Sequence, residues 1–147
     1  MKKMKILITK DTMSEIYLDA VKIRHKVFVQ EQGVPLEREI DKDEAYSIHF
    51  VLYTEDHRAA ATVRLLPLNK QELKLQRMAV LKEFRGQKMG DALLQEAELF
   101  AKQQEFHQIR LDAQLSAQTF YESHGYLAYG EVFQDANIDH IHMKKDL

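Results

Sequence analysis

Apolar and polar residues alternate along several short segments of the chain, and this period of two is typical of β-strands. Turn residues or helical stretches separate these segments from one another. The segments are residues 5–9, 49–54, 59–66, 73–80, 108–113, 126–133 and 138–144. The pattern therefore predicts about seven strands.

Apolar residues recur at every third or fourth position in two longer segments, which predicts amphipathic helices. The first helix is expected to begin at a capping box formed by Thr12 and Glu15 and to run to about Gln30. A shorter helix over residues 117–124 would be capped by Ser116. The central helix carries its apolar stripe on Met89, Leu93, Ala97 and Phe100.

The order of these elements predicts the fold class. The three strands within residues 49–80 are expected to form an antiparallel meander, and residues 73–113 a right-handed parallel strand–helix–strand crossover. No repeat, low-complexity tract or linker interrupts the sequence. We therefore expect one α/β domain over residues 1–147, with a mixed, mostly antiparallel, twisted sheet of about seven strands and helices on both faces.

The alternation slips within the strand at residues 73–80. Leu73 and Leu75 share one face, whereas Met78 and Val80 share the other. A β-bulge produces such a slip and frees backbone groups of the strand. A strand that is covered on both faces also shows weak alternation, and the sequence leaves both interpretations open.

Composition and charge exclude several classes of function. The formal net charge of −2 gives no global electrostatic reason to expect nucleic acid as a partner. The absence of cysteine excludes disulfides, thiolate metal sites and a cysteine nucleophile. The sequence contains no Walker A, HExxH or GxSxG motif, and no signal peptide or transmembrane stretch. We therefore expect a cytoplasmic protein that does not associate with a membrane.

A basic, glycine-containing turn, residues 85–90, joins the strand at residues 73–80 to the central helix. Such a turn points several free backbone N–H groups at one place, and the dipole of the helix favours an anion there. Arg85 and Lys88 add positive charge. The stretch therefore predicts a phosphate-binding turn.

Two motifs resemble the GNAT N-acetyltransferase superfamily. The turn Arg85-Gly86-Gln87-Lys88-Met89-Gly90 is similar to the family signature Q/R-x-x-G-x-G/A, with Lys88 at a position that is usually glycine. Lys88 is expected to be helical and to offer only its N–H. The segment from Ala117 through Phe120 and Tyr121 to Gly125 and Tyr126 resembles the family's A-x-x-F-Y-E-x-x-G-F/Y motif. Residues 24–35 and 138–143 resemble the small bacterial YjcF/ElaA-like branch.

The resemblance implies acetyl-CoA as co-substrate and an amine of a small molecule or peptide as acceptor. The pyrophosphate would bind at the turn, and pantetheine would pair with backbone freed near Met78 and Val80. The N–H of Val80 could polarise the thioester, and Tyr121 is the family-matched donor of a proton to the leaving thiolate. The cofactor-binding residues expected from the resemblance are Met78, Ala79, Val80, Arg85, Gly86, Gln87, Lys88, Met89, Gly90, Gln114 and Tyr121.

The general base is not identified by this resemblance, because many family members have a glutamate where this chain has Gln76 and Arg77. The candidates are His49 and three acids of the loop at residues 31–43, although acids in such a loop are often only solvated. Deprotonation through a water is an equal alternative. The loop acids concerned are Glu31, Glu39 and Asp41.

His140 and His142 share one face of the last predicted strand and could bind a metal, but no third ligand is evident. We expect them to be structural and no metal to be bound, although His140 could instead line the acceptor pocket.

An exposed sheet edge is compatible with a homodimer. Two other functions remain open: a non-catalytic acyl-CoA-binding or regulatory module on the same fold, and a plain nucleotide-phosphate binder.

Overall fold

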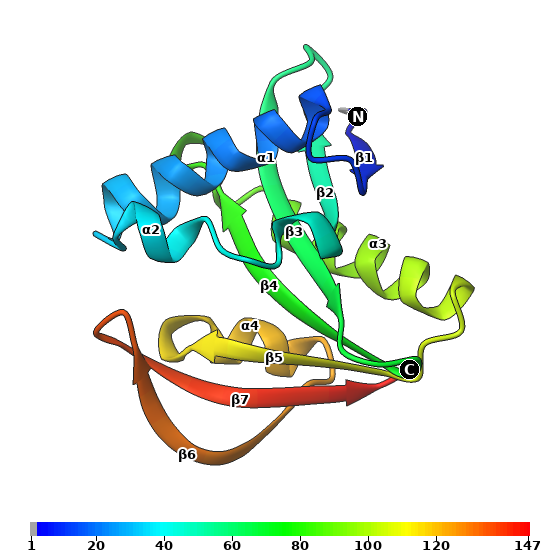
Figure 1. Ribbon diagram of the computed structural model, residues 1–147, viewed down its shortest axis with the longest axis vertical. Coiled ribbons are helices and arrows are strands. Elements are labelled where there is room, and N and C mark those ends of the chain that lie inside the picture. Colours follow the sequence, from blue (N-terminus) through cyan, green and yellow to red (C-terminus); the bar gives the residue numbers. More distant parts are fainter. Residues whose placement is uncertain (1–2) are drawn as a thin grey trace.

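In the described part of the chain, seven strands form one sheet in the order β1-β2-β3-β4-β5-β7-β6 (Figure 1). The structure is a computed structural model, and it describes residues 3–147. All neighbouring strands are antiparallel except β4 and β5, which are parallel, so the predicted meander and parallel crossover are confirmed. The strands are β1 (Lys5–Thr9), β2 (Ile48–Tyr53), β3 (Ala59–Pro67), β4 (Glu72–Val80), β5 (Gln108–Gln114), β6 (Leu127–Asp135) and β7 (Ile138–Asp146).

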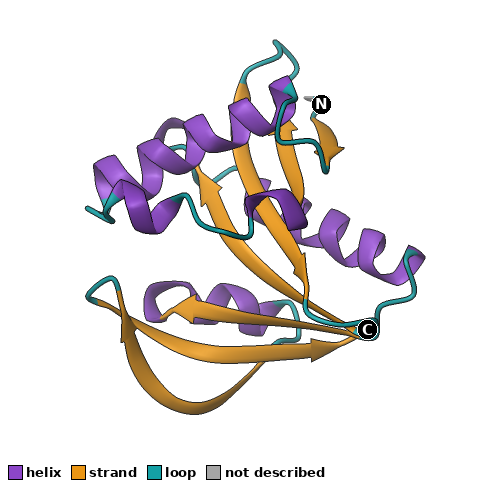
Figure 2. Ribbon diagram, viewed as in Figure 1, coloured by secondary structure: helices purple, strands orange, loops and turns teal. Residues whose placement is uncertain are grey.

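Helices cover both faces of the sheet, as the sequence predicts (Figure 2). The two long ones, α1 and α3, pack on opposite faces of β2 and β3, whose residues are buried almost throughout. The helices are α1 (Glu15–Arg24), the π-helix η1 (His25–Glu31), α2 (Leu36–Glu39), α3 (Met89–Gln103) and α4 (Gln118–Ser123), with 3₁₀ turns η2 (Glu44–Tyr46), η3 (Lys82–Phe84) and η4 (Leu115–Ala117).

Two predicted helix caps are wrong. Ser14, not Thr12, caps α1, because its side chain accepts a hydrogen bond from the N–H of Tyr17 at 3.2 Å. Ser116 lies inside the 3₁₀ turn η4, so α4 begins one residue later than predicted, at Gln118, and Ala117 occupies its N-cap position. The first predicted helix has the expected extent, but its second half is the π-helix η1.

A β-bulge in β4 is confirmed. Thr62 pairs with Ala79 and Arg64 pairs with Gln76, so Arg77 and Met78 together face one residue of β3. Arg77 adopts a left-handed backbone conformation with φ 59°, which accommodates the extra residue. The slip in the apolar alternation thus coincides with a bulge at Arg77 and Met78.

The bulge separates β4 from β5. These strands pair only from Glu72 and Gln108 to Leu75 and Leu111, whereas β5 stays paired with β7 as far as Gln114. The two strands therefore diverge toward their C-terminal ends, and Figure 1 shows the fork between them. In the part of the chain that the structure describes, no helix is long and apolar enough to span a bilayer.

Candidate functional site

Two neighbouring cavities lie at the C-terminal end of β4. The first, the fork cavity, has a volume of about 370 Å³ and lies between β4 and β5. The second, the turn cavity, has a volume of about 310 Å³ and lies over the turn at residues 85–90. Phe120 lines both cavities, so they meet at its side chain.

The turn presents free backbone donors, as the sequence predicts. The first helical hydrogen bond of α3 runs from the N–H of Ala92 to the carbonyl oxygen of Lys88, at 3.1 Å. Within residues 3–147, the N–H groups of residues 86–91 have no hydrogen-bond acceptor. Such a row of donors at the N-terminus of a 15-residue helix favours an anionic ligand.

The structure contradicts the helical conformation predicted for Lys88. It is the N-cap of α3 and has left-handed backbone angles, φ 61° and ψ 27°. This conformation costs a residue with a side chain about 1 kcal/mol and suits glycine, the residue usual at this position of the signature. The chain therefore keeps the backbone geometry of the turn despite the lysine.

Arg85 is held at the turn by two contacts. Its Nε donates to the carbonyl oxygen of Val80 at 3.0 Å, and its Nη2 donates to Oε1 of Glu31 at 2.8 Å. Glu31, a predicted candidate base, thus lies at the turn and is not among the residues that line the fork cavity. It connects the C-terminal end of η1 to the turn.

The predicted cofactor residues fall into three groups. Met78, Gln114 and Tyr121 line the fork cavity. Ala79 is buried in the core and Gln87 is exposed, and neither lines a cavity. The turn cavity is lined by the remaining six residues, Val80, Arg85, Gly86, Lys88, Met89 and Gly90.

Tyr121 extends from α4 into the fork cavity. The side chain is only 6% exposed, and among the described residues its hydroxyl has no hydrogen-bond partner. Burial raises the pKa of this hydroxyl above the ordinary value of a tyrosine. The hydroxyl of this lining residue is therefore protonated and able to donate.

Glu39 is part of a buried ionic network. Its Oε1 lies 2.7 Å from Nε of Arg24 and 3.3 Å from Nε of Arg77. Its Oε2 is buried and has no partner in the described part of the chain. Glu39 lines the fork cavity and is 1% exposed, and both arginines bind the same oxygen of its carboxylate.

The network continues beneath the cavity through Glu44. Glu44 binds Arg24 at 2.7 Å and Arg64 at 2.9 Å, and Arg64 also binds Asp41 at 2.9 Å. Burial opposes the ionisation of Glu44, but the bonds with Arg24 and Arg64 prevail and hold the pKa of its carboxyl well below its usual range. Burial also opposes the charge on Arg24, and the bonds with Glu44 and Glu39 raise its pKa nonetheless.

His49, another predicted candidate base, lies in this buried region. It is 1% exposed, and its Nε2 lies 2.9 Å from the carbonyl oxygen of Glu44, to which it must donate. Burial lowers its pKa. Since His49 lines neither cavity, the structure does not bring it together with Tyr121.

The two histidines of β7 have different surroundings. His140 lines the fork cavity and is 9% exposed. His142 is not among the lining residues: its Nδ1 lies 2.6 Å from Oδ1 of Asp112, and its ring stacks on Phe133. Within the described residues, no group of three or more histidine, aspartate or glutamate side chains is placed to hold a metal ion.

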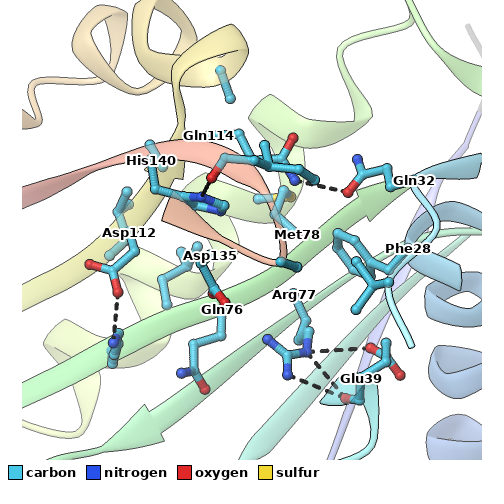
Figure 3. Close-up of a pocket in the computed structure, with 18 of the residues that line it drawn as sticks. Phe28, Gln32, Glu39, Gln76, Arg77, Met78, Asp112, Gln114, Asp135 and His140 are labelled. Carbon is cyan, nitrogen blue, oxygen red and sulfur yellow. Dashed lines mark hydrogen bonds and ion pairs between the residues drawn. The ribbon is translucent and has the colours of Figure 1, made fainter. Parts of the chain in front are cut away.

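Several lining residues are not predicted from the sequence, among them Phe28, Asp112 and Asp135 (Figure 3). Asp112 alternates with buried residues of β5 and carries no motif. Its carboxylate is bound by Lys74 at 2.9 Å and by His142; burial opposes its ionisation, but these two partners lower its pKa. Each carboxylate that lines the fork cavity is thus paired with a cation or a histidine.

Comparison with known proteins gives a consistent result. A family model described as the acetyltransferase (GNAT) domain matches residues 14–147. A Bacillus subtilis (strain 168) protein named uncharacterized N-acetyltransferase YjcF is 37% identical over 144 residues, which cover 97% of this chain and 100% of that protein. A solved structure from Lactobacillus plantarum is 30% identical with a TM-score of 0.90, covering 98% of each chain. Escherichia coli ElaA is 26% identical with a TM-score of 0.82, covering 99% of each chain.

Proposed function

Since this chain belongs to the GNAT acetyltransferase family, we propose that it transfers the acetyl group of acetyl-CoA directly to a primary amine of a small molecule or peptide. The observation that carries the proposal is the position of the Tyr121 hydroxyl. Tyr121 lines a cavity that opens where β4 leaves β5 and that adjoins the turn at residues 85–90.

The fit of acetyl-CoA to the two cavities supports the proposal. The free N–H groups of residues 86–91, with the charges of Arg85 and Lys88 beside them, suit a pyrophosphate. Beyond Leu75, β4 has no pairing with β5, so its edge near Met78 is open to the amide groups of pantetheine. The thioester then lies where the two cavities meet, between Val80 of one and Tyr121 of the other, and the fork cavity receives the acceptor amine.

The acetyl transfer follows from the chemistry of these groups. The lone pair of the amine attacks the carbonyl carbon of the thioester, a C–N bond forms and the C–S bond breaks. The N–H of Val80 is the proposed donor to the carbonyl oxygen as it gains negative charge. Tyr121 gives its proton to the leaving sulfur and regains one from the nitrogen, so the hydroxyl is restored.

Turnover of acetyl-CoA tests this proposal. The wild-type protein is incubated with acetyl-CoA and, in turn, benzylamine, ethanolamine, spermidine and lysine methyl ester, and the free thiol of CoA is measured. Amine-dependent release of thiol with a matching acetylated product is expected. Tight binding of CoA without turnover of any amine would indicate a binding module. Competition by ATP or NAD as strong as that by CoA would indicate a general nucleotide-phosphate binder.

A further inference from the structure

One ring nitrogen of His140 is engaged in a hydrogen bond, and the other has no hydrogen-bond partner among residues 3–147. Its Nδ1 lies 2.7 Å from the carbonyl oxygen of Ile138. A carbonyl oxygen only accepts, so the hydrogen bond places the ring proton on Nδ1. In the neutral ring the lone pair is therefore on Nε2, which has no hydrogen-bond partner among residues 3–147.

The ring is held in place within the fork cavity. Residue 140 pairs with Gln114 at the C-terminal end of β5, and Gln114 is itself bound to Gln32 at 2.9 Å. The imidazole stacks on Phe133, with centroids 5.8 Å apart and an angle of 27° between the planes. Figure 3 shows His140 on the β7 side of the cavity, with Glu39 and Arg77 on the other side.

The other ionisable groups that could accept a proton in this cavity are engaged. Glu39 is bound by two arginines, and Asp112 by Lys74 and His142. Asp135 is bound by Arg38 at 2.6 Å. A carboxylate that is paired with a cation is a poor base, because protonation breaks the pair.

We propose that Nε2 of His140 is the general base that removes a proton from the acceptor ammonium. The inference rests on the proposed function, since it assigns a group to that same reaction. The acceptor enters as R–NH3⁺ and gives one proton to His140, which passes it to solvent. The resulting R–NH2 attacks the thioester, and the second proton that the nitrogen loses replaces the one that Tyr121 gives to sulfur.

The test compares two substitutions in β7 with two kinds of acceptor. His140→Gln removes the basic nitrogen, and His142→Gln is the matched control on the same strand, outside the cavity. The first acceptor is the amine from the panel above that the wild type acetylates fastest, which is protonated at pH 7. The second is hydroxylamine, whose nitrogen is largely unprotonated at that pH.

We expect His140→Gln to lose activity with the protonated amine and to keep most of its activity with hydroxylamine. His140→Gln is expected to lower kcat/KM for the protonated amine by about 100-fold or more, and for hydroxylamine by less than about fivefold, with unchanged affinity for CoA. His142→Gln is expected to change both by less than about threefold. An equal loss with both acceptors would show a structural role and overturn the assignment, while the wild-type turnover would leave the acetyltransferase proposal intact.

The tautomer of His140 can be tested without an acceptor. Long-range ¹H–¹⁵N NMR of the free protein, with His140→Gln for assignment, is expected to show the proton on Nδ1 and a bare Nε2. A proton on Nε2 would leave no lone pair toward the cavity and would contradict the proposal. Wild-type protein that acetylates none of the panel amines would instead contradict the proposed function itself.

Discussion

Nη2 of Arg38 lies 2.6 Å from Oδ1 of Asp135, and this ion pair joins α2 to the C-terminal end of β6. The two residues are 97 positions apart in the sequence. Both line the fork cavity, and their side chains are 54% and 56% exposed. The pair therefore lies at the rim of the cavity, where an entering acceptor would meet it.

Asp135→Asn is expected to affect acceptor binding more than stability. An exposed ion pair contributes at most about 1 kcal/mol, so the melting temperature should change little. The KM for the amine should change more than kcat, because the substitution frees Arg38 at the rim. Steady-state kinetics and thermal unfolding measure both effects. Glu83→Gln is the control, because Glu83 forms an equally exposed pair with Arg58 and lines neither cavity.

Tyr121→Phe is expected to lower kcat by about 100-fold while the Kd for CoA stays the same, because only the proton donor is removed. Tyr126→Phe is the matched control: Tyr126 is buried and donates to Glu98 at 2.9 Å but lines neither cavity. This control should lose stability but not turnover. A kcat of Tyr121→Phe close to that of the wild type would rule out Tyr121 as the acid.

The raised pKa of Tyr121 also predicts the form of the pH profile. Because burial keeps the hydroxyl protonated, its ionisation should begin only above the usual tyrosine value of about 10. The wild-type rate should therefore show no loss from this group between pH 8 and about pH 10. A decline over that range that disappears in Tyr121→Phe would contradict the assignment.

The sequence predicted those features whose cause is local. The slipped alternation in β4 left a bulge as one of two interpretations, and the structure has a bulge there, since two side chains against one partner shift the period by one residue. The turn at residues 85–90 was also predicted, because its glycines and basic residues are consecutive in the sequence. The conformation of Lys88 was not, since lysine favours helix and only the tertiary fold imposes left-handed angles.

The partners of the charged residues depend on the fold as a whole. Three candidate side chains have the chemistry of a general base: Glu31, Glu39 and His49. The sequence does not show which of them will be bound by an arginine or will donate to a carbonyl oxygen in the fold. The contacts between Arg24 and Glu39 and between Arg38 and Asp135 join elements whose relative positions come from sheet order and packing. The free Nε2 of His140 in the fork cavity follows from a hydrogen bond of Nδ1 that the sequence does not reveal.

Lys88→Gly is expected to stabilise the protein by about 1 kcal/mol, because glycine adopts left-handed angles without strain. The Kd for CoA should rise only mildly, since the N–H that faces the anion remains. Lys88→Ala is the control that removes the charge but keeps the strain, so it should lack the gain in stability. Denaturant unfolding and calorimetric titration with CoA measure both quantities, and destabilisation by glycine would contradict the strain at this position.

Gly90→Val is expected to weaken CoA binding at least about tenfold. A Cβ added at Gly90 lies 3.4 Å from Cζ of Phe120, where the two cavities meet, so the larger side chain of valine crowds this ring. Gly90→Ala makes only an ordinary contact and should retain most of the affinity. Unchanged affinity in Gly90→Val would show that the cofactor does not pass this point.

Glu44→Gln is expected to lower the free energy of unfolding by about 3–5 kcal/mol at pH 7, because Arg24 and Arg64 lose a shared buried carboxylate.

The lowered pKa of Glu44 sets the pH dependence of this contribution to stability. A carboxyl whose pKa is lower in the folded state stabilises the fold above its unfolded value, about 4.3, and loses this contribution as the pH falls below it. The wild-type stability should therefore fall below about pH 5, and the variant should show a flatter curve there. Urea unfolding from pH 7 to pH 3 measures this, with Glu55→Gln, an exposed site in the β2–β3 turn, as the control. Parallel curves for Glu44→Gln and wild type would show that other carboxyls govern the acid sensitivity.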